Sequence, residues 1–532
     1  MVAAGLSGIC VAQDMQGPTK YWAYFKDKKD TLPEADWISQ KARRRRARHN
    51  FPAATYADAP VHPKYVTQVA ERADSMGHAS RWLNAVAFWG DSHIAGQVSA
   101  LPGVRRVAAM PRLASGPASM PATDASGSLA VDRLRAYQVG RLQIDSFRKA
   151  GLDGRDVTIA IFDAGFKGAQ KTPALRHLWE ENRILRLRDF VGRDSNVFFP
   201  SAHGTMVLSC IGGREDTSAY GLAPEARFML ARTERYLWEV ASEEDHWIAA
   251  LEWAERHGAD LVNSSLGYTT PRYRRSDMNG RVSPVSRAAG LSARRGLLVI
   301  NSAGNDGDGN WRYIAAPADE DSVLSVGATA PKTDLRAPFS SVGPNAMGEL
   351  APRVCAPGIV AGASGQDPVK VQGTSFSAPL VTGFAACLLQ RKPALRAMEL
   401  FEIIQKSGHL HPYYDYELGH GVPQASRALQ LLAPETKPQI NPTFRSSVEQ
   451  SRLQIELERS VYQKRLRDGE PQHVYVFYHV ARANGTLKAY RLLRNPQQEI
   501  IIHLEPLDET DLIRVHYEGY TLELPMDEVI RN

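Results

Sequence analysis

The chain has 532 residues, of which 43% are hydrophobic and 23% charged, so it can bury a sizeable core. The length allows one large domain and one or two small ones. The formal net charge of +6 is small for this length, and part of it comes from an arginine run at 43–46 followed by Arg48. Because no nucleic-acid-binding signature accompanies the run, we expect a solvated helix face and no nucleic-acid partner.

The four cysteines give no sign of a metal site. No Cys-x-x-Cys pair occurs and no histidines lie at zinc-binding spacing, so we expect no structural zinc. The neighbours of Cys210, Cys355 and Cys387 are apolar or small, as is typical of buried thiols. Their disulfide state stays open at this point.

The N-terminus carries a weak export pattern. Residues 1–12 are small and mostly apolar, but no Lys or Arg precedes them, so residues 1–14 are interpreted as a weak or truncated signal peptide. A frayed terminus is the alternative. No later stretch approaches the roughly 18 apolar residues of a membrane helix, so we expect no transmembrane segment. A secreted, periplasmic or cell-surface location follows.

Residues 20–112 have the pattern of a small α+β domain. An aromatic strand at 20–25 precedes the polar arginine-rich helix. An amphipathic helix over 62–77 is expected to close at Gly77, before a buried strand, a short helix and a last strand. Residues 113–133 are rich in Ser, Ala, Gly and Pro, and this composition predicts a linker.

Residues 134–433 alternate short apolar strands with helical patterns. This alternation predicts an α/β fold with a doubly wound, mostly parallel sheet, in which sites lie at the carboxyl ends of strands. Residues 434–532 begin with a Pro-containing linker. A charged helix at about 445–468 and several strands should follow, with Asn484-Gly485 as a hairpin turn, which predicts a small β-rich domain.

Hydrolysis of an amide by a serine needs a base beside the hydroxyl, a carboxylate behind the base, and donors for the oxyanion. Asp163 ends an apolar strand, His203 and Ser375 each begin a helical run, and Asn305 follows a strand between two glycines. Taken singly, each has a structural alternative: a turn or capping Asp, a core or capping His, an N-cap Ser and a turn Asn.

Five segments together resemble the subtilisin-like serine peptidases. They are IFDAGF around Asp163, HGTMV at His203, NSSLGY at 263–268, NSAGND at Asn305 and GTSFSAP at Ser375. The order Asp, His, Ser along the chain is the one known for subtilisin, so it is carried over with the resemblance.

The resemblance implies a serine endopeptidase with a polypeptide substrate. Asp163 would orient His203, His203 would be the general base and Ser375 the nucleophile. The side chain of Asn305 and the backbone N–H of Ser375 would form the oxyanion hole. The substrate would lie along two further segments of the chain, which are Ser265, Leu266 and Gly267, and Ala303 and Gly304.

Two positions depart from the family pattern: Ala164 follows the Asp where Thr or Ser is usual, and Met206 replaces a frequent second His. No Asp-rich calcium loop is evident, so we assign no metal ligand and expect no cofactor for the chemistry, while structural calcium stays open. Residues 20–112 resemble the propeptides of these enzymes. They would act as a folding chaperone and inhibitor, with processing within 113–133.

Two alternatives belong to other classes. The first is a catalytically silent binding protein on the same fold. The second is an unrelated α/β hydrolase or nucleotide-binding enzyme, which would need a G-x-S-x-G elbow or a phosphate-binding loop, and the sequence has neither.

Overall fold

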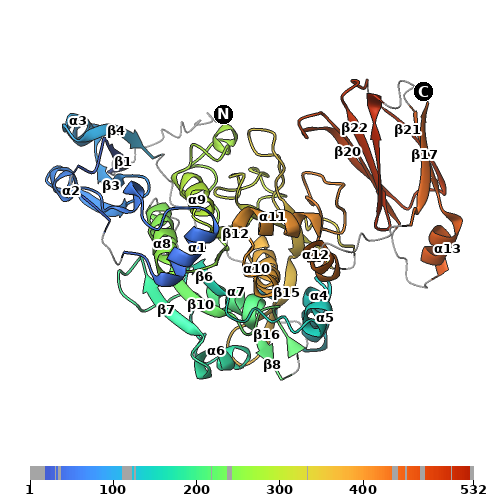
Figure 1. Cartoon of the computed structure of the whole chain (residues 1–532), viewed down its shortest axis with the longest axis horizontal. Coiled ribbons are helices and arrows are strands. Elements are labelled where there is room, and N and C mark those ends of the chain that lie inside the picture. The colour runs from blue at the N-terminus through green and yellow to red at the C-terminus, as the bar shows by residue number, and fades with distance from the viewer. Residues whose placement is uncertain are drawn as a thin grey trace, which may run out of the picture.

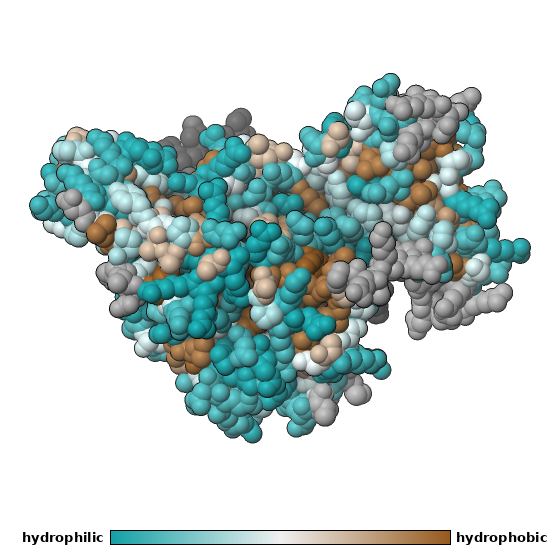
Figure 2. All heavy atoms as spheres, viewed as in Figure 1, coloured by the Kyte–Doolittle hydropathy of each residue, from teal (hydrophilic) through white to brown (hydrophobic). Residues whose placement is uncertain are grey.

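The computed structural model contains three units along the chain (Figure 1). An N-terminal α+β unit and a C-terminal β unit flank a central α/β unit. The face shown in Figure 2 is largely hydrophilic, with hydrophobic residues gathered in separate patches. The structure describes residues 18–29, 31–33, 37–110, 123–124, 128–216, 218–235, 242–331, 333–433, 441–449, 452–467, 474–504 and 506–527.

The N-terminal unit is a four-stranded antiparallel sheet in the order β2-β3-β1-β4. Because side chains alternate along β1, Ala23 and Phe25 pack into the unit's own core, whereas Trp22 and Tyr24 pack onto the central unit. The elements are β1 (Thr19–Phe25), α1 (Gln40–Arg48), η1 (Tyr56–Asp58), α2 (Pro63–Ala70), β2 (Ser75–Ser80), β3 (Ala85–Gly90), α3 (Ser92–Ser99) and β4 (Val104–Ala109).

The amphipathic helix predicted to close at Gly77 ends earlier, at Ala70. Gly77 instead lies inside β2, where an added Cβ would come within 2.8 Å of Ala87 Cβ and 2.6 Å of Asp245 Oδ2. Gly77 is therefore required by close packing of the sheet, not by a helix end.

Helix α1 attaches this unit to the central unit through buried ions. The Glu255 carboxylate lies 2.6 Å from Arg45 Nη2 and 2.8 Å from Arg46 Nε, and Arg46 also pairs with Asp58 at 2.7 Å and 2.8 Å. These four side chains are at most 1% exposed. The expected solvated face is therefore wrong for Arg45 and Arg46, because their charges are neutralised by a partner about 210 residues further along the chain.

The central sheet has seven parallel strands in the order β14-β13-β12-β11-β6-β10-β7. Six of its strands are largely buried because both faces are covered, as is usual for parallel sheets, whereas the edge strand β7 is mostly exposed. The predicted fold class is confirmed. The strands are β6 (Thr158–Asp163), β7 (Ile184–Asp189), β10 (Arg227–Arg232), β11 (Leu261–Ser264), β12 (Leu298–Ser302), β13 (Leu324–Thr329) and β14 (Val354–Pro357).

Helices α8 and α9 cover one face of the sheet, and α7 and α10 cover the other. The N-terminal unit packs on the outer side of α8 and α9, as Figure 1 shows. The helical elements of this unit are α4 (Ser128–Gly140), α5 (Ile144–Lys149), η2 (Pro173–Leu175), α6 (Arg176–Glu180), α7 (His203–Gly212), α8 (Glu243–His257), η3 (Arg275–Asp277), α9 (Pro284–Arg294), α10 (Thr374–Arg391), α11 (Ala397–Lys406) and α12 (Ala425–Leu432).

Two small sheets complete the central unit. One has the order β15-β16-β5 and the other is the pair β8-β9. Their strands are β5 (Thr123–Asp124), β8 (Arg214–Glu215), β9 (Ser218–Ala219), β15 (Ile359–Ala363) and β16 (Pro368–Gln372). Most of the predicted linker at 113–133 and all of the signal-like segment at 1–14 lie outside the described residues, and residues 128–133 belong to α4.

The C-terminal unit pairs a three-stranded sheet, β17-β18-β21, with a four-stranded sheet, β20-β19-β22-β23, around one core. The predicted hairpin at Asn484-Gly485 joins β19 and β20, with φ of +82° at Gly485. The elements are β17 (Phe444–Glu449), β18 (Arg452–Leu457), α13 (Arg459–Arg467), β19 (Tyr475–Ala481), β20 (Leu487–Arg494), β21 (Glu499–His503), β22 (Leu512–Tyr517) and β23 (Tyr520–Pro525).

The charged helix predicted over 445–468 is wrong for most of its length. Strands β17 and β18 occupy 444–449 and 452–457, and a helix begins only at Arg459. The buried side chains of Leu453, Ile455 and Leu457 recur every second residue, which is the period of a strand. The polar residues that alternate with them, Arg452, Gln454 and Glu456, lie on the exposed face of β18.

Removing the charge of Glu255 tests the buried ion cluster. We expect Glu255→Gln to lower the free energy of unfolding by about 3 kcal/mol, because Arg45 loses its buried counter-charge while Arg46 keeps Asp58. Urea unfolding of the full-length chain measures it. The matched control is Glu402→Gln, whose pair with Lys406 is half exposed and should cost less than about 0.5 kcal/mol. Equal losses in both variants would contradict the cluster's role.

Candidate active site

Asp163 is the last residue of β6 and is fully buried at the carboxyl edge of the sheet. Its Oδ1 accepts a hydrogen bond from the N–H of Ala164 at 2.8 Å. Gly204 lets the start of α7 approach this carboxylate, because an added Cβ there would lie 2.9 Å from Asp163 Cβ and 2.6 Å from the carbonyl O of Gly165. The sequence therefore permits a close contact between β6 and α7.

His203 begins α7 and uses that approach. Its Nδ1 lies 2.9 Å from both carboxylate oxygens of Asp163. Burial disfavours the imidazolium, but the charge and hydrogen bond of Asp163 outweigh it and raise the pKa of His203 above its ordinary value. Asp163 thus fixes the tautomer with the proton on Nδ1 and leaves Nε2 as the basic nitrogen.

Ser375 lies in the first turn of α10, next to the unpaired N–H groups of a helix start. Gly373 precedes the helix with φ of +144°, a conformation that favours glycine. The Ser375 hydroxyl donates to the carbonyl O of Ser265 at 3.2 Å. No hydrogen bond joins it to His203, although both residues are described; the His203 ring instead lies 5.3 Å from that of Phe376, the residue after Ser375.

Asn305 follows β12 and is oriented by Thr374. The N–H and the hydroxyl of Thr374 both donate to Asn305 Oδ1, each at 2.9 Å. This arrangement identifies the amide oxygen and leaves Asn305 Nδ2 as a donor with no partner among the described residues. The amide lies beside Gly373, whose added Cβ would be 3.5 Å from Nδ2.

The two predicted substrate segments lie at neighbouring strand ends. Ser265, Leu266 and Gly267 follow β11, and Ala303 and Gly304 follow β12, which pairs with β11. Gly267 is exposed, and an added Cβ would come within 2.6 Å of Ala315 Cβ. A side chain at 267 would therefore collide with Ala315 unless one of the two segments shifted.

A buried hydrogen-bond relay behind Ser375 was not predicted. Thr382 Oγ1 donates to Asn263 Oδ1 at 3.0 Å, and Asn263 Nδ2 donates to Ser265 Oγ at 3.1 Å. The Ser265 hydroxyl then donates to the carbonyl O of Ser375 at 2.8 Å. The only signal in the sequence was the polar triplet Asn263-Ser264-Ser265 directly after apolar residues.

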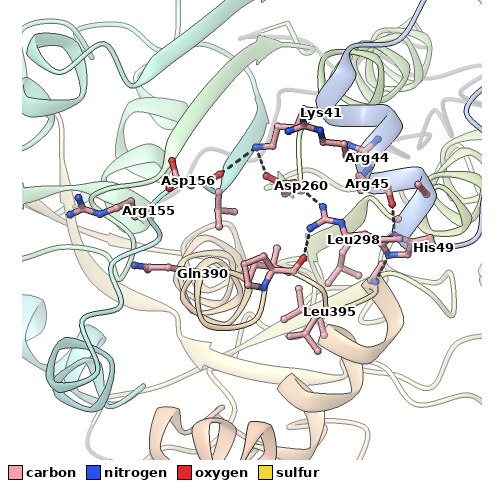
Figure 3. Close-up of a pocket in the computed structure, with 18 residues that line it drawn as sticks. Lys41, Arg44, Arg45, His49, Arg155, Asp156, Asp260, Leu298, Gln390 and Leu395 are labelled. Carbon is pink, nitrogen blue, oxygen red and sulfur yellow. Dashed lines mark hydrogen bonds and ion pairs between the residues drawn. The ribbon is translucent and has the colours of Figure 1, made fainter.

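Outside the candidate active site we considered metal sites, membrane helices, cysteines and cavities. In the described ranges, no three His, Cys, Asp or Glu side chains are grouped to hold a metal ion, and no helix there is long and apolar enough to cross a membrane. Cys210, Cys355 and Cys387 are buried free thiols. A cavity of about 740 Å³ lies between α1 and the amino ends of β6, β11 and β12 (Figure 3).

That cavity lies at the opposite edge of the sheet from Asp163. Two of its cations are engaged with the central unit: Lys41 Nζ donates to Thr158 Oγ1 at 2.6 Å and lies 2.5 Å from Asp260 Oδ2, and Arg48 donates to the carbonyl O of Pro393. Figure 3 shows Lys41 of α1 reaching Asp260 of the central unit. The cavity is thus part of the seam between the two units.

Comparison with known proteins gives the class. A family model described as "Subtilase family" matches residues 154–421, and one described as "Peptidase S8 propeptide domain, Bacteroidota" matches residues 20–124. Since the first covers half of the chain, the chain belongs to the subtilase family. It is a serine-type endopeptidase with an N-terminal propeptide domain.

Individual relatives agree. Subtilisin DY of Bacillus licheniformis is 26% identical over 268 residues, covering 50% of this chain and 88% of the relative. Serine protease AprX of Bacillus subtilis is 26% identical over 286 residues, covering 48% of this chain and 61% of the relative, which is less than two thirds of its length. The crystal structure of fervidolysin from Fervidobacterium pennivorans, a keratinolytic enzyme related to subtilisin, shares the fold with a TM-score of 0.55 and 17% identity, covering 94% of this chain and 70% of that one.

The contact between Asp163 and His203 predicts that the titration midpoint of His203 depends on the carboxylate. We expect His203 to titrate above pH 6.5 in the native protein and below pH 6.5 in Asp163→Asn, because burial then acts without an opposing charge. NMR of the imidazole Hε1 against pH measures both midpoints. Asp308→Asn, at an exposed position, is the control and should leave the midpoint unchanged. An unchanged midpoint in Asp163→Asn would show that the carboxylate does not act on His203.

Proposed function

We propose that Asp163, His203 and Ser375 form the catalytic triad of this endopeptidase, and that the chain is made as a zymogen. The observation that carries the proposal is the contact of both Asp163 oxygens with His203 Nδ1 at 2.9 Å, at the sheet edge where Ser375 begins a helix. Ligands of such sheets bind at the carboxyl ends of the strands.

The first half-reaction forms an acyl-enzyme. His203 Nε2 takes the proton of Ser375 Oγ as the oxygen attacks the carbonyl carbon of the scissile peptide bond. The negative charge that develops on the carbonyl oxygen is bound by Asn305 Nδ2 and the backbone N–H of Ser375. The imidazolium, stabilised by Asp163, then gives its proton to the leaving amine. Water hydrolyses the ester with His203 again as the base.

The substrate backbone is expected to lie along Ser265, Leu266 and Gly267, opposite Ala303 and Gly304. An extended peptide binds a strand-like edge mainly through main-chain hydrogen bonds. The carbonyl O of Ser265 now accepts from the Ser375 hydroxyl. A substrate N–H donating to the same oxygen would release that hydroxyl for His203.

The zymogen proposal rests on the packing of the N-terminal unit. This unit buries Trp22 and Tyr24 against the central unit and adds the ion pairs of Arg45 and Arg46 with Glu255. Residues 20–124 match a propeptide family, and these contacts hold the unit on the peptidase. We therefore expect the unit to inhibit the peptidase until the chain is cut within 113–133. A location outside the cytoplasm fits a zymogen, and one curated relative is named "Minor extracellular protease Epr".

Ser375→Ala tests both proposals. Without the hydroxyl no acyl-enzyme forms, so peptidase activity should fall by a factor of about 10⁶, a loss known for subtilisin and carried over here. A fluorophosphonate probe should label the native protein and not the variant. Intact mass should show that the native protein loses residues up to a point within 113–133, whereas the variant keeps them.

The control for this experiment is Ser377→Ala, two residues further along α10. Ser377 donates to the carbonyl oxygens of Ala356 and Pro357 and has no part in the proposed chemistry. It should still react with the probe. Near-normal activity of folded Ser375→Ala would refute the triad, and failure of the native protein to react with the probe would favour a catalytically silent binding protein. A fully active native protein with an uncut N-terminal unit would refute only the zymogen.

Asn305→Ala tests the oxyanion hole. We expect kcat to fall by a factor of about 100 to 1,000, a figure known for subtilisin itself, with little change in KM. The control is Asn310→Ala, which changes an exposed asparagine of the same loop and should leave kcat unchanged. Steady-state kinetics on a chromogenic peptide separate the two constants. A raised KM with kcat preserved would mean that Asn305 binds the substrate in its ground state.

A further inference from the structure

Five of the 15 histidines of the chain gather where the C-terminal unit meets the central unit. The meeting surface is formed by the loop 407–424, between α11 and α12, and by strands β19 and β22. Figure 1 places the C-terminal sheets beside α11 and α12. We call these five the interface histidines; they are His409, His411, His420, His479 and His516.

Direct contacts hold the two units together at this surface. The Tyr413 ring stacks on the ring of His479 with centroids 4.9 Å apart and planes at 24°. The Tyr414 hydroxyl donates to the carbonyl O of Gly485 at 2.7 Å. The N–H of Leu487 donates to the Tyr416 hydroxyl at 3.0 Å. The interface is therefore aromatic and hydrogen-bonded, with the histidines inside it.

The hydrogen bonds of three of these histidines, His479, His411 and His409, require neutral rings. His479 Nδ1 lies 2.6 Å from the carbonyl O of Tyr414, so it must carry a proton, while its Nε2 lies 3.4 Å from the guanidinium of Arg514, which can only donate. His411 Nδ1 likewise faces the guanidinium of Arg427 at 3.4 Å. A second proton on either ring would turn the acceptor nitrogen into a donor. The ring would then carry a positive charge that faces the positively charged guanidinium.

The same holds for His409, whose Nδ1 accepts from the N–H of Val422 at 2.8 Å. Its neighbour across the interface is His516, which is 3% exposed and also faces Arg427. His420 packs against His411 with ring centroids 4.9 Å apart. Protonating several of these rings would thus bring like charges together at a surface where His479 and His516 are buried and His409, His411 and His420 are partly buried.

The surrounding charges offer little compensation. Asp415 already accepts from the Tyr413 hydroxyl and from two backbone N–H groups, Glu417 pairs with Arg336, and Glu523 pairs with Arg514. The charged groups that face the interface histidines from the elements packed there are Arg141, Arg336, Arg353, Lys406, Asp415, Glu417, Arg427, Arg514 and Glu523.

Burial lowers the pKa of each interface histidine. The pKa falls to about 3 for His420, His479 and His516 and to about 4 for His411, with the neighbouring arginines adding to the effect, and it lies well below the ordinary value for His409. One group acts in the opposite direction, because burial raises the pKa of Asp415 to about 6 and its protonation favours the docked form. One carboxyl thus opposes five imidazoles.

We propose that the C-terminal unit is docked on the central unit only while the interface histidines are neutral, and that it undocks reversibly in mildly acidic solution. The proposal does not depend on the catalytic assignment. When the units separate, His479 and His516 reach water and bind protons in the ordinary range for histidine. Mild acid therefore stabilises the undocked form by mass action.

The sign and size follow from linkage. Docking lowers the pKa of these histidines, so docking is strongest above pH 6.5 and weakens as the pH falls below it. A histidine whose pKa moves from about 6.5 undocked to about 3 docked weakens docking by about 100-fold at pH 4.5. His479 and His516 together should weaken it by about 10⁴-fold.

The test measures the distance between the two units. Spin labels are placed on Met398→Cys in α11 and Arg491→Cys in β20, both exposed, in full-length Ser375→Ala protein with Cys10→Ser. The cysteines at 210, 355 and 387 are buried. We expect a narrow distance distribution at pH 7.5, a broad one at pH 4.5, and recovery of the narrow one on return to pH 7.5.

Two variants carry the argument. In His479→Asn/His516→Asn, the amides can replace the Nδ1 contacts with the carbonyl O of Tyr414 and with Thr521 Oγ1, but they cannot take up a proton. The distribution should therefore stay narrower than that of the native interface at pH 4.5. His503→Asn, which changes an exposed histidine of β21 in the same unit, should broaden like the native interface.

The converse variant keeps the proposal falsifiable if the double variant fails to fold. His479→Lys, with folding checked by circular dichroism, should broaden the distribution already at pH 7.5. The proposal is overturned if the native interface stays narrow down to pH 4.5, or if the folded double variant broadens to the same extent as the native interface.

Discussion

A parallel sheet has to be covered on both faces, and this constraint organises the whole molecule. Seven parallel strands, of which all but the edge strand β7 are largely buried, point their carboxyl ends to one edge. The helices that cover one face, α7 and α10, bring His203 and Ser375 to that edge beside Asp163. The helices that cover the other face, α8 and α9, leave an outer surface on which the N-terminal unit packs. The candidate site and the propeptide contact thus share one cause.

Local patterns in the sequence predicted the central sheet well because its strands are short apolar runs between helical patterns. The local patterns also singled out the candidate site residues. Each of these residues follows a strand or begins a helix, and in a parallel sheet those positions lie at the same edge. The order of these residues was meaningful only through the family resemblance. The relay from Thr382 through Asn263 to Ser265 was missed because hydrogen bonds between distant buried polar side chains leave no periodic signal.

The errors have physical causes too. The arginine run was assigned to solvent because its counter-charge, Glu255, lies about 210 residues away and cannot be inferred locally. Strands β17 and β18 were taken for a helix because charged residues recur through 445–457, whereas the alternation of Leu453, Ile455 and Leu457 was the better guide. Nor did any local pattern link His409 with His516, since their proximity depends on how two separately folded units meet.

The ion cluster of Arg45, Arg46, Asp58 and Glu255 has a consequence for ionic strength. Dissolved salt screens charges that water reaches, but it reaches buried pairs much less. The pairs of Lys41 and Arg48 with Asp260, with Lys41 38% and Arg48 36% exposed, are therefore parts of the seam that salt can weaken. The pairs of Arg45 and Arg46 with Glu255 are at most 1% exposed and keep their strength. The affinity of the N-terminal unit for the peptidase should thus be nearly the same at low and at high ionic strength.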